Sequence, residues 1–425
     1  MSHTQYNRPQ HAPFSVKHHK AKLVHYGGWL PASSETYEAF FSQLTDKVSP
    51  RHAKALGHTP AVMEFADAIK APSDYEPKMI DLFNQIFIQA SSQNKIKDFE
   101  WLLHMLDIIV VQPPGFVIAR GDDGNPIGEP IGVPIYIVFD LLGNTTAAYD
   151  LFRRPAFNVA MKNLLNSWGK YLEGPDSNKT LTDQEGGVVQ QAGHGSINRG
   201  YRSWDEFFVR EIQSSARPMH TSHDPAIDAG IIISACESTV LRIEHHVKLH
   251  DQFWLKGMKY SLYDMLAGHD TGGLRRRPIS GTITKALVLP GTYYAVLPDD
   301  GAEEGDPDLE PGAPYGAMIR SQPWLTQSST RALIFIKSPN PKIGMVCFIG
   351  VGMAEVSTCG LSVQAGQEVK KGDELGMFHF GGSTHALLFG PQTKITFNDL
   401  IVDPNTGKVH VNTHIKVLSA LANVN

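Results

Sequence analysis

The chain has 425 residues, more than one hydrophobic core usually supports, which predicts two domains. Hydrophobic residues make up 42% and charged residues 19%, the composition of an ordinary soluble globular protein. A net charge of -5 argues against the basic surface that general nucleic-acid binding needs. The three cysteines, Cys236, Cys347 and Cys359, form no CxxC or CxxH pair, which favours a reducing compartment and small buried thiols.

No targeting or transmembrane segment is expected. Residues 1–34 lack the apolar stretch of a secretory signal, and their single arginine argues against a mitochondrial transit peptide. The most apolar segments, Met105–Val111 and Ile131–Leu142, are interrupted by charged residues or proline, and both are shorter than the roughly 20 residues that span a bilayer. We therefore expect a cytoplasmic protein.

Residues 1–173 are predicted to form a helical N-terminal domain, because apolar side chains recur there at the spacing of one helical face. Ser33 and Glu35 offer an N-cap and an acidic first turn for the first helix. Pro77 suits the first turn of another. The apolar stripes, read as bundle core, cover residues 37–48, 79–87, 101–109 and 157–168.

Two polar segments interrupt this pattern. Gly121–Pro126 contains paired aspartates but no later acidic ligand at the offset of a calcium loop, so a surface turn is predicted and no metal site. Residues 174–200 are rich in Gly, Asn, Gln, Asp and Ser, which predicts a linker.

Residues 201–425 are predicted to form a β-rich domain, so the fold class is α+β. Gly and Pro separate short β-branched runs there, which is typical of strands joined by turns. Residues 299–314 are acidic and rich in Pro and Gly, which predicts a long surface loop. The predicted strands are residues 231–233, 240–243, 282–284, 332–336 and 345–349.

Residues 366–376 alternate turn glycines with exposed charges, and they resemble the β-hammerhead of biotinyl and lipoyl carrier domains. Such carriers present a modifiable lysine on the next hairpin. Residues 377–384 occupy that place here and contain no lysine, which argues against a carrier function.

The hairpin instead contains Gly381–Gly382–Ser383–Thr384. Gly382 has no Cβ, so its carbonyl is open to attack by the hydroxyl of Ser383. Attack exchanges the amide for an ester, and elimination followed by hydrolysis leaves a pyruvoyl group at a new N-terminus. Such a ketone can form a Schiff base with a substrate amine and accept the electrons released when CO2 leaves.

Five motifs in order resemble the phosphatidylserine decarboxylase family, whose members cleave themselves at a Gly-Ser bond. They lie at residues 204–210, 217–218, 256–262, 278–292 and 378–384. The long helical front half and the lack of a membrane anchor resemble the soluble fungal branch, which includes tryptophan decarboxylases.

The resemblance implies cleavage at Gly382–Ser383 into residues 1–382 and 383–425, with the pyruvoyl cofactor made from Ser383. It implies decarboxylation of a free aromatic amino acid such as tryptophan, with phosphatidylserine as the alternative substrate. His379, Phe380 and Thr384 flank the bond and are assigned to substrate binding. We also expect a small-molecule substrate and no nucleic-acid partner, and a homo-oligomer is possible.

Two catalytic positions depart from the family pattern. Glu237 stands where the family has an aspartate, and it either orients a histidine base or is a solvated strand-end residue. The family's histidine stretch before residue 278 is missing, so His269 is the nearest substitute, and His379 and His385 flank the cleavage site. Arg275–Arg276–Arg277 could bind a substrate carboxylate or lie in a solvated turn. A natural variant with another base, an inactive homologue and a gene model lacking coding sequence all remain open.

Overall fold

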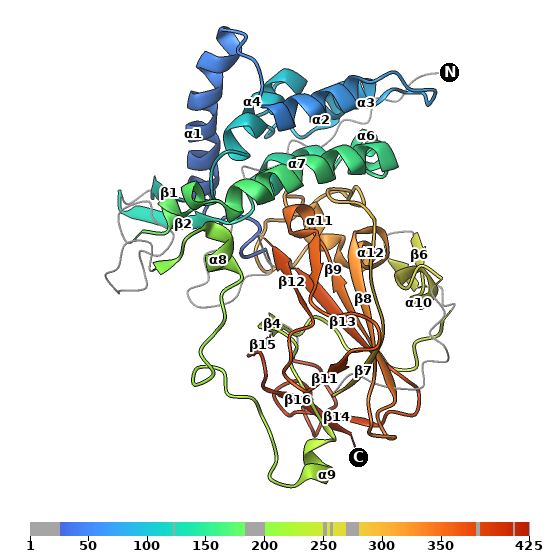
Figure 1. The fold of residues 1–425 in the computed structure, drawn as a ribbon. Helices are drawn as coiled ribbons and strands as arrows, with labels where there is room; N and C mark the ends of the chain where they lie inside the picture. Colours follow the sequence, from blue (N-terminus) through green and yellow to red (C-terminus); the bar gives the residue numbers. More distant parts are fainter. Residues whose placement is uncertain are drawn as a thin grey trace. The chain divides into compact units, whose positions relative to one another are not determined.

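The computed structural model describes residues 26–121, 124–182, 200–249, 253–255, 258–268, 280–379, 383–410 and 413–424. The chain forms two compact units, Met1–Tyr201 with Tyr294–Ser321, and Arg202–Tyr293 with Gln322–Asn425. Helices, in blue to green, dominate the first unit, and strands, mainly orange and red, dominate the second (Figure 1). The sequence predicts that residues 294–321 belong to the second domain, whereas in the structure they belong to the helical unit.

The helices of the first unit begin where the sequence supplies caps or prolines. The hydroxyl of Ser33 accepts a hydrogen bond from the backbone N–H of Thr36, and Asp98 accepts one from Trp101. Pro77 lies before its helix, whose N-cap is Lys78, and not in the first turn as predicted. The helices are α1 (Ser34–Ala53), α2 (Pro60–Lys70), α3 (Met79–Gln89), α4 (Phe99–Ile109), α5 (Pro134–Gly143), α6 (Thr146–Phe152), α7 (Pro155–Glu173), η1 (Pro175–Thr180) and α11 (Ala317–Arg320).

Aromatic side chains fill the core of this unit, as the helical stripes predict. The rings of Phe152 and Phe157 stack at 4.6 Å between centroids, and Phe83 lies 4.8 Å from Phe99. All ten residues of α5 are buried, which explains why its sequence is apolar apart from Asp140. None of the described helices is long and apolar enough to cross a membrane.

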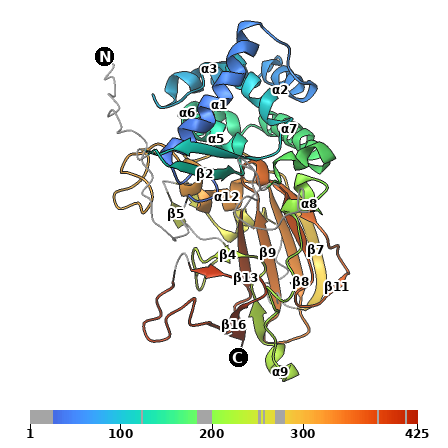
Figure 2. The ribbon, with the colours of Figure 1, turned by 90° about the vertical axis from the view of Figure 1, so that its left-hand side faces the viewer.

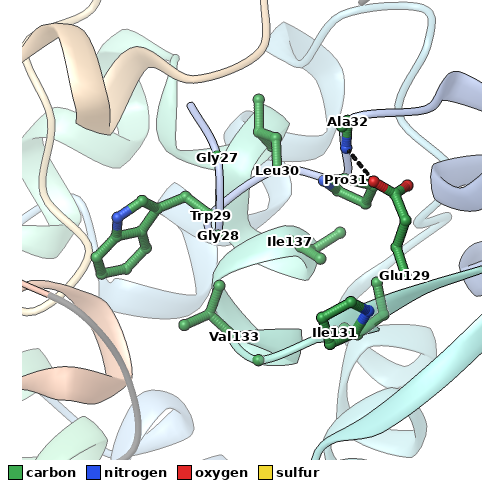
Figure 3. Close-up of a pocket in the computed structure, with 12 residues that line it drawn as sticks. Gly27, Gly28, Trp29, Leu30, Pro31, Ala32, Glu129, Ile131, Val133 and Ile137 are labelled. Atoms are coloured by element: carbon green, nitrogen blue, oxygen red, sulfur yellow. Dashed lines mark hydrogen bonds between the residues drawn. The ribbon is translucent and has the colours of Figure 1, made fainter. Parts of the chain in front are cut away.

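A β-hairpin that was not predicted from the sequence lies between α4 and α5. Strands β1 (Gly115–Arg120) and β2 (Pro126–Ile131) pair antiparallel around the predicted surface turn. The carboxylate of Glu129 on β2 accepts a hydrogen bond from the backbone N–H of Ala32 at 2.9 Å (Figure 3). It accepts a second from the backbone N–H of Ser33 at 3.1 Å, at the start of α1. This contact helps to line a small cavity of about 200 Å³, whose walls are mostly apolar.

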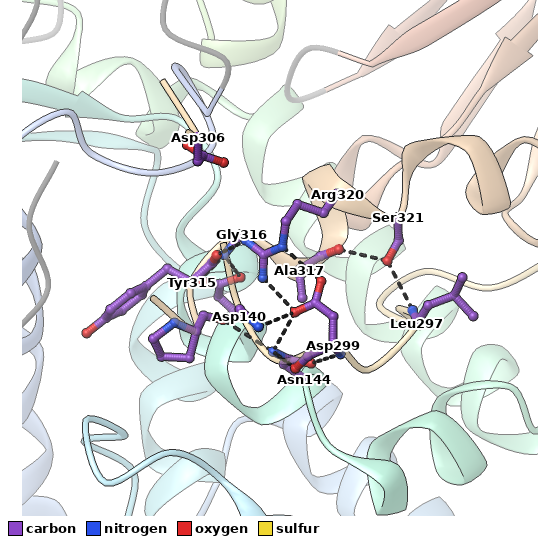
Figure 4. Close-up of polar contacts among 12 residues, drawn as sticks. Asp140, Asn144, Leu297, Asp299, Asp306, Tyr315, Gly316, Ala317, Arg320 and Ser321 are labelled. Atoms are coloured by element: carbon purple, nitrogen blue, oxygen red, sulfur yellow. Dashed lines mark hydrogen bonds and ion pairs between the residues drawn. The ribbon is translucent and has the colours of Figure 1, made fainter. Parts of the chain in front are cut away.

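Residues 299–314 contain no helix or strand, as their composition predicts, but only part of this segment lies at the surface. Ala302, Leu309 and Ala313 are buried, and the guanidinium of Arg320 donates to both carboxylate oxygens of Asp299 at 2.8 Å. The carboxylate of Asp140 on α5 accepts from the backbone N–H of Gly316 at 3.0 and 3.1 Å (Figure 4). These bonds hold the segment on the helices, whereas Asp300, Glu303 and Glu304 remain exposed.

The second unit is built on an antiparallel sheet of five strands, ordered β11-β7-β8-β9-β13. Figure 2 shows β7, β8, β9 and β13 side by side. All residues of β8 except Lys337 are buried, as expected for the centre of the sheet. The strands are β7 (Gly281–Leu289), β8 (Arg331–Lys337), β9 (Met345–Val351), β11 (Glu368–Val369) and β13 (Thr384–Phe389).

Smaller sheets and short helices complete this unit. Strands β14 (Ile395–Phe397), β16 (Ala420–Val424) and β3 (Ile231–Ile233) form a three-stranded sheet. The remaining pairs are β10 (Thr358–Leu361) with β12 (Gly376–His379), β4 (Ser238–Thr239) with β15 (His414–Ile415), and β5 (Phe253–Leu255) with β6 (Met258–Tyr260). The helices are α8 (Trp204–Phe208), α9 (Pro225–Asp228), α10 (Leu262–Met265), α12 (Gln322–Ser328) and η4 (Ala354–Val356).

The strand predictions for 231–233, 282–284, 332–336 and 345–349 are confirmed, and the last three extend further. The prediction for 240–243 is wrong, because the ladder ends at Thr239. Leu241 is 46% exposed, so the apolar run there has no core to bury it. Gly366 and Gly372, at the turns of the predicted hammerhead, both have positive φ values, 89° and 90°.

Candidate active site

Ser383 lies directly before β13, an edge strand of the five-stranded sheet. Strand β13 pairs with β9 so that Thr384 is opposite Val351. The hydroxyl of Ser383 donates a short hydrogen bond to the backbone carbonyl of Val351. The sheet register and this bond therefore fix where the candidate nucleophile lies. Gly382 and Phe380 lie outside the described residues.

Glu237 is an ion-paired residue and not a free strand-end side chain. The guanidinium of Arg217 donates to both of its carboxylate oxygens. The backbone N–H of Val417 donates to the Oε2 atom at 3.0 Å. These hydrogen bonds, with that of Arg217 first, lower the pKa of Glu237 to about 2. Glu237 is therefore ionised throughout the physiological pH range.

His414 is the histidine partner of Glu237, and sequence reasoning missed it. Its Nε2 atom lies 3.0 Å from the Oε1 atom of Glu237. The contact arises because β15, which contains His414, pairs with β4, directly after Glu237. The two segments are far apart in the chain and His414 belongs to no motif, so no sequence pattern indicates this pair.

His385 is partly buried beside the segment that carries Glu237. Its Nδ1 atom lies 3.2 Å from the Sγ atom of Cys236, and its ring stacks on Phe348 with centroids 5.6 Å apart. Burial lowers the pKa of His385 below the ordinary 6.5. Its imidazole is therefore neutral at pH 7, the form that a general base requires.

His379 ends β12, and its Nδ1 atom lies 2.7 Å from a carboxylate oxygen of Asp205 on α8. Both side chains are about four-fifths buried. Thr384 is partly buried at the first position of β13. Both assigned substrate-binding residues that the structure describes therefore lie on the two strands that precede and follow Ser383 in the chain.

The other candidate site residues that the structure describes form no direct hydrogen bond with the hydroxyl of Ser383. Among the described residues, no hydrogen bond joins Ser383 to Glu237 or to a histidine. Cys236, the neighbour of Glu237, contacts His385, which is two residues beyond Ser383. His269 and Arg275–Arg276–Arg277 lie outside the described residues.

Comparisons with known proteins cover both halves of the chain. Residues 59–197 match one family model described as phosphatidylserine decarboxylase, and residues 204–416 match a second with the same description. The decarboxylase iboD of Amanita muscaria is 46% identical over 75% of this chain and 99% of its own length. The L-tryptophan decarboxylase of Psilocybe cubensis is 27% identical over 92% of this chain and 94% of its own.

Phosphatidylserine decarboxylase proenzyme 2 of Komagataella phaffii is 29% identical, over 51% of this chain and 21% of its own length. The match thus extends to proteins whose names specify a lipid substrate. The family models fall on the helical region and on the β-rich region that holds Ser383, Glu237, His385 and His414. The chain belongs to the phosphatidylserine decarboxylase family and is a carboxy-lyase.

Proposed function

We propose that this protein is a pyruvoyl-dependent decarboxylase of a free aromatic L-amino acid, with tryptophan as the first substrate to test. The observation that carries the proposal is the fixed position of the Ser383 hydroxyl at the head of β13. The similarity to the L-tryptophan decarboxylases of two Psilocybe species, which covers 92% and 89% of this chain, supports the substrate class.

Self-cleavage would make the cofactor from the chain itself. The Oγ atom of Ser383 attacks the carbonyl carbon of Gly382, the C–N bond breaks, and an ester replaces the amide. Loss of the Cα proton of Ser383 then breaks the ester Cβ–O bond, which leaves Gly382 as a carboxylate and residue 383 as dehydroalanine. Its imine tautomer takes up water and releases ammonia, leaving the pyruvoyl group. No external oxidant or reductant is needed.

His385 is the proposed base for this cleavage. Ser383 and His385 are two residues apart at the start of a strand, a spacing that places their side chains on the same face. Burial keeps His385 neutral, and its contact with Cys236 holds the ring in place. His385 thus replaces the histidines that the family carries before residue 278.

Glu237 acts in this proposal by position and charge. With a pKa of about 2 it cannot donate a proton near neutral pH. It accepts bonds from Arg217, Val417 and His414, and so it joins three segments of the second unit beside Cys236. Glu237 and Arg217 are therefore assigned as positioning residues for the cleavage.

A pyruvoyl group at residue 383 supplies an electrophilic ketone that accepts the electron pair released with CO2. At the start of β13 this group would take the place of the Ser383 side chain, and it would have no O–H to donate to the carbonyl of Val351. His379, oriented by Asp205, and Thr384 are the described residues proposed to bind the substrate. Phe380 is proposed for the same role from its place in the motif.

Two alternatives stay open to experiment. Phosphatidylserine is the second candidate substrate, because relatives that match about half of this chain are named for it. A homologue that never cleaves itself is the other, suggested by the missing histidine stretch. The β-hammerhead, a homo-oligomer and a cytoplasmic location remain predictions.

The test is amine release by the purified protein from an amino-acid panel that includes L-tryptophan. We expect tryptamine from the wild type and none from Ser383→Ala. Ser362→Ala is the matched control, because that hydroxyl bonds to exposed Glu374 on another turn of the same unit. Ethanolamine-lipid formation from phosphatidylserine vesicles, without amine release from any amino acid, would replace the proposed substrate class with the lipid.

A further inference from the structure

A cluster of histidines and carboxylates lies among the helices of the first unit. Glu100, His104 and Asp107 follow one another at helical spacing on α4, so they share one face. His58, just before α2, meets this face with its Nδ1 atom 2.8 Å from the Oδ2 atom of Asp107. The Nδ1 atom of His104 lies 3.5 Å from that same oxygen. One ligand atom each from His58, His104 and Asp107 thus lie within 4.8 Å of one another.

The side chain of His104 is the unusual member of this cluster. It is only 1% exposed, and among the residues that the structure describes neither of its ring nitrogens has a hydrogen-bond partner. A buried polar group without a partner is costly, and such groups are rare in folded proteins. A buried imidazole whose nitrogen lone pair is unused can bind a metal ion.

We propose that His58, His104 and Asp107 form a binding site for a divalent transition metal, with Zn²⁺ as the best match. Tetrahedral bonds of 2.0–2.1 Å place neighbouring ligand atoms about 3.3 Å apart. The distances of 2.8 and 3.5 Å from Asp107 Oδ2 to the two Nδ1 atoms lie on either side of that value. Two imidazoles, one carboxylate and a water molecule form a typical zinc ligand set.

The surroundings of the three ligands favour this arrangement. The Oδ1 atom of Asp107 already accepts hydrogen bonds from Thr59, through its backbone N–H at 2.7 Å and its hydroxyl at 3.0 Å. Asp107 is therefore held with Oδ2 facing the histidines. Glu100 Oε1 lies 2.8 Å from the other ring nitrogen of His58. A carboxylate there fixes the tautomer and leaves the Nδ1 atom free to bind the metal.

Arg51 competes with a metal ion for the same oxygen. Its Nη2 atom donates to Asp107 Oδ2 at 3.2 Å and to the backbone carbonyl of Gly57. The side chain is 30% exposed, so it can move into solvent when a cation binds. We therefore expect that removing the charge of Arg51 strengthens metal binding. If the Arg51–Asp107 ion pair had only a structural role, its removal would not have this effect.

The test is Zn²⁺ titration of the full-length protein after chelation and dialysis, followed by calorimetry. We expect one Zn²⁺ per chain in the helical unit, and tetrahedral visible absorption when Co²⁺ is used instead. His104→Asn should abolish this binding, and Glu100→Ala should weaken it about 10–100-fold. Arg51→Gln should strengthen it.

His52→Asn is the matched control, because its ring lies 5.9 Å from that of His104 but supplies none of the three ligands. It should bind Zn²⁺ as the wild type does. Circular dichroism of each variant shows whether it is folded. Folded His104→Asn protein that binds Zn²⁺ like the wild type would overturn the proposal, as would wild-type protein that takes up no stoichiometric metal.

Discussion

The guanidinium of Arg217 contacts both carboxylate oxygens of Glu237, with Nε 2.9 Å from Oε2 and Nη2 2.7 Å from Oε1. This bidentate geometry is the strong form of an arginine–carboxylate pair. It explains why a glutamate at this position is fully ionised, and it ties Glu237 to the Arg217–Pro218 motif found in the sequence.

We expect Glu237→Gln to lower the free energy of unfolding by about 1 kcal/mol at pH 7, because the pair is one-third exposed and solvent screens it. Its pKa falls from 4.5 to about 2 on folding. The stabilisation is therefore present above pH 4.5 and is lost as the pH falls toward 2. Urea denaturation across this range should show the wild type and variant converging in acid. A gap that stays constant would contradict the assignment.

His385→Asn should stop self-cleavage while leaving the protein folded. Pulse-labelled cell-free translation measures the rate at which the precursor disappears. Because burial lowers the pKa of His385 below 6.5, the wild-type rate should be constant from pH 7 to 8 and fall only in more acidic solution.

His410→Asn serves as the control for this prediction, because His410 is exposed in the same unit. It should cleave like the wild type. Normal cleavage of His385→Asn would remove His385 from the mechanism and direct attention to His269 and His379.

Asp140 should make the stability of the helical unit depend on pH. Burial raises the pKa of its carboxyl from 3.8 to about 6. The folded state therefore binds a proton more tightly, and stability falls as the pH rises from about 4 to 6, by about 2–3 kcal/mol. Urea denaturation of Asp140→Asn should lack this component. An unchanged pH profile would show that Asp140 does not titrate in this range.

Arg331 should be important for the stability of the second unit. Its buried guanidinium donates to the backbone carbonyls of Asp264, Met265 and Ser329. Arg331→Met removes the guanidinium donor of the Met265 and Ser329 carbonyls, whereas Asp264 keeps the backbone N–H of Ala267, and we expect a cost of about 2–4 kcal/mol in the free energy of unfolding. Arg242→Met removes an exposed arginine that pairs with Glu244, and it should cost less than about 1 kcal/mol.

The sequence predicted the parts of the fold that depend on local pattern. The N-cap at Ser33 and the strand at 231–233 are both as expected, because caps and β-branched runs act over a few residues. The return of residues 294–321 to the helices was not predictable, because it depends on contacts such as Asp140 with Gly316 across 176 positions.

The same limit applies to the site. Ser383 and Glu237 were found from motifs whose residues are adjacent in the chain. The pair of Glu237 with His414 depends on a two-residue ladder between β4 and β15, and the contact of Cys236 with His385 spans 149 positions. Neither contact can be predicted from the spacing of residues in the sequence.

Mass spectrometry of the purified protein under denaturing conditions shows directly whether the chain cleaves itself at Gly382–Ser383. We expect two fragments, of which the smaller has 43 residues, from residue 383 to Asn425. Its N-terminus should be blocked to Edman chemistry and carry a ketone that reacts with hydrazide or is reduced by borohydride. A single intact chain of 46.8 kDa with Ser383 unmodified would contradict it.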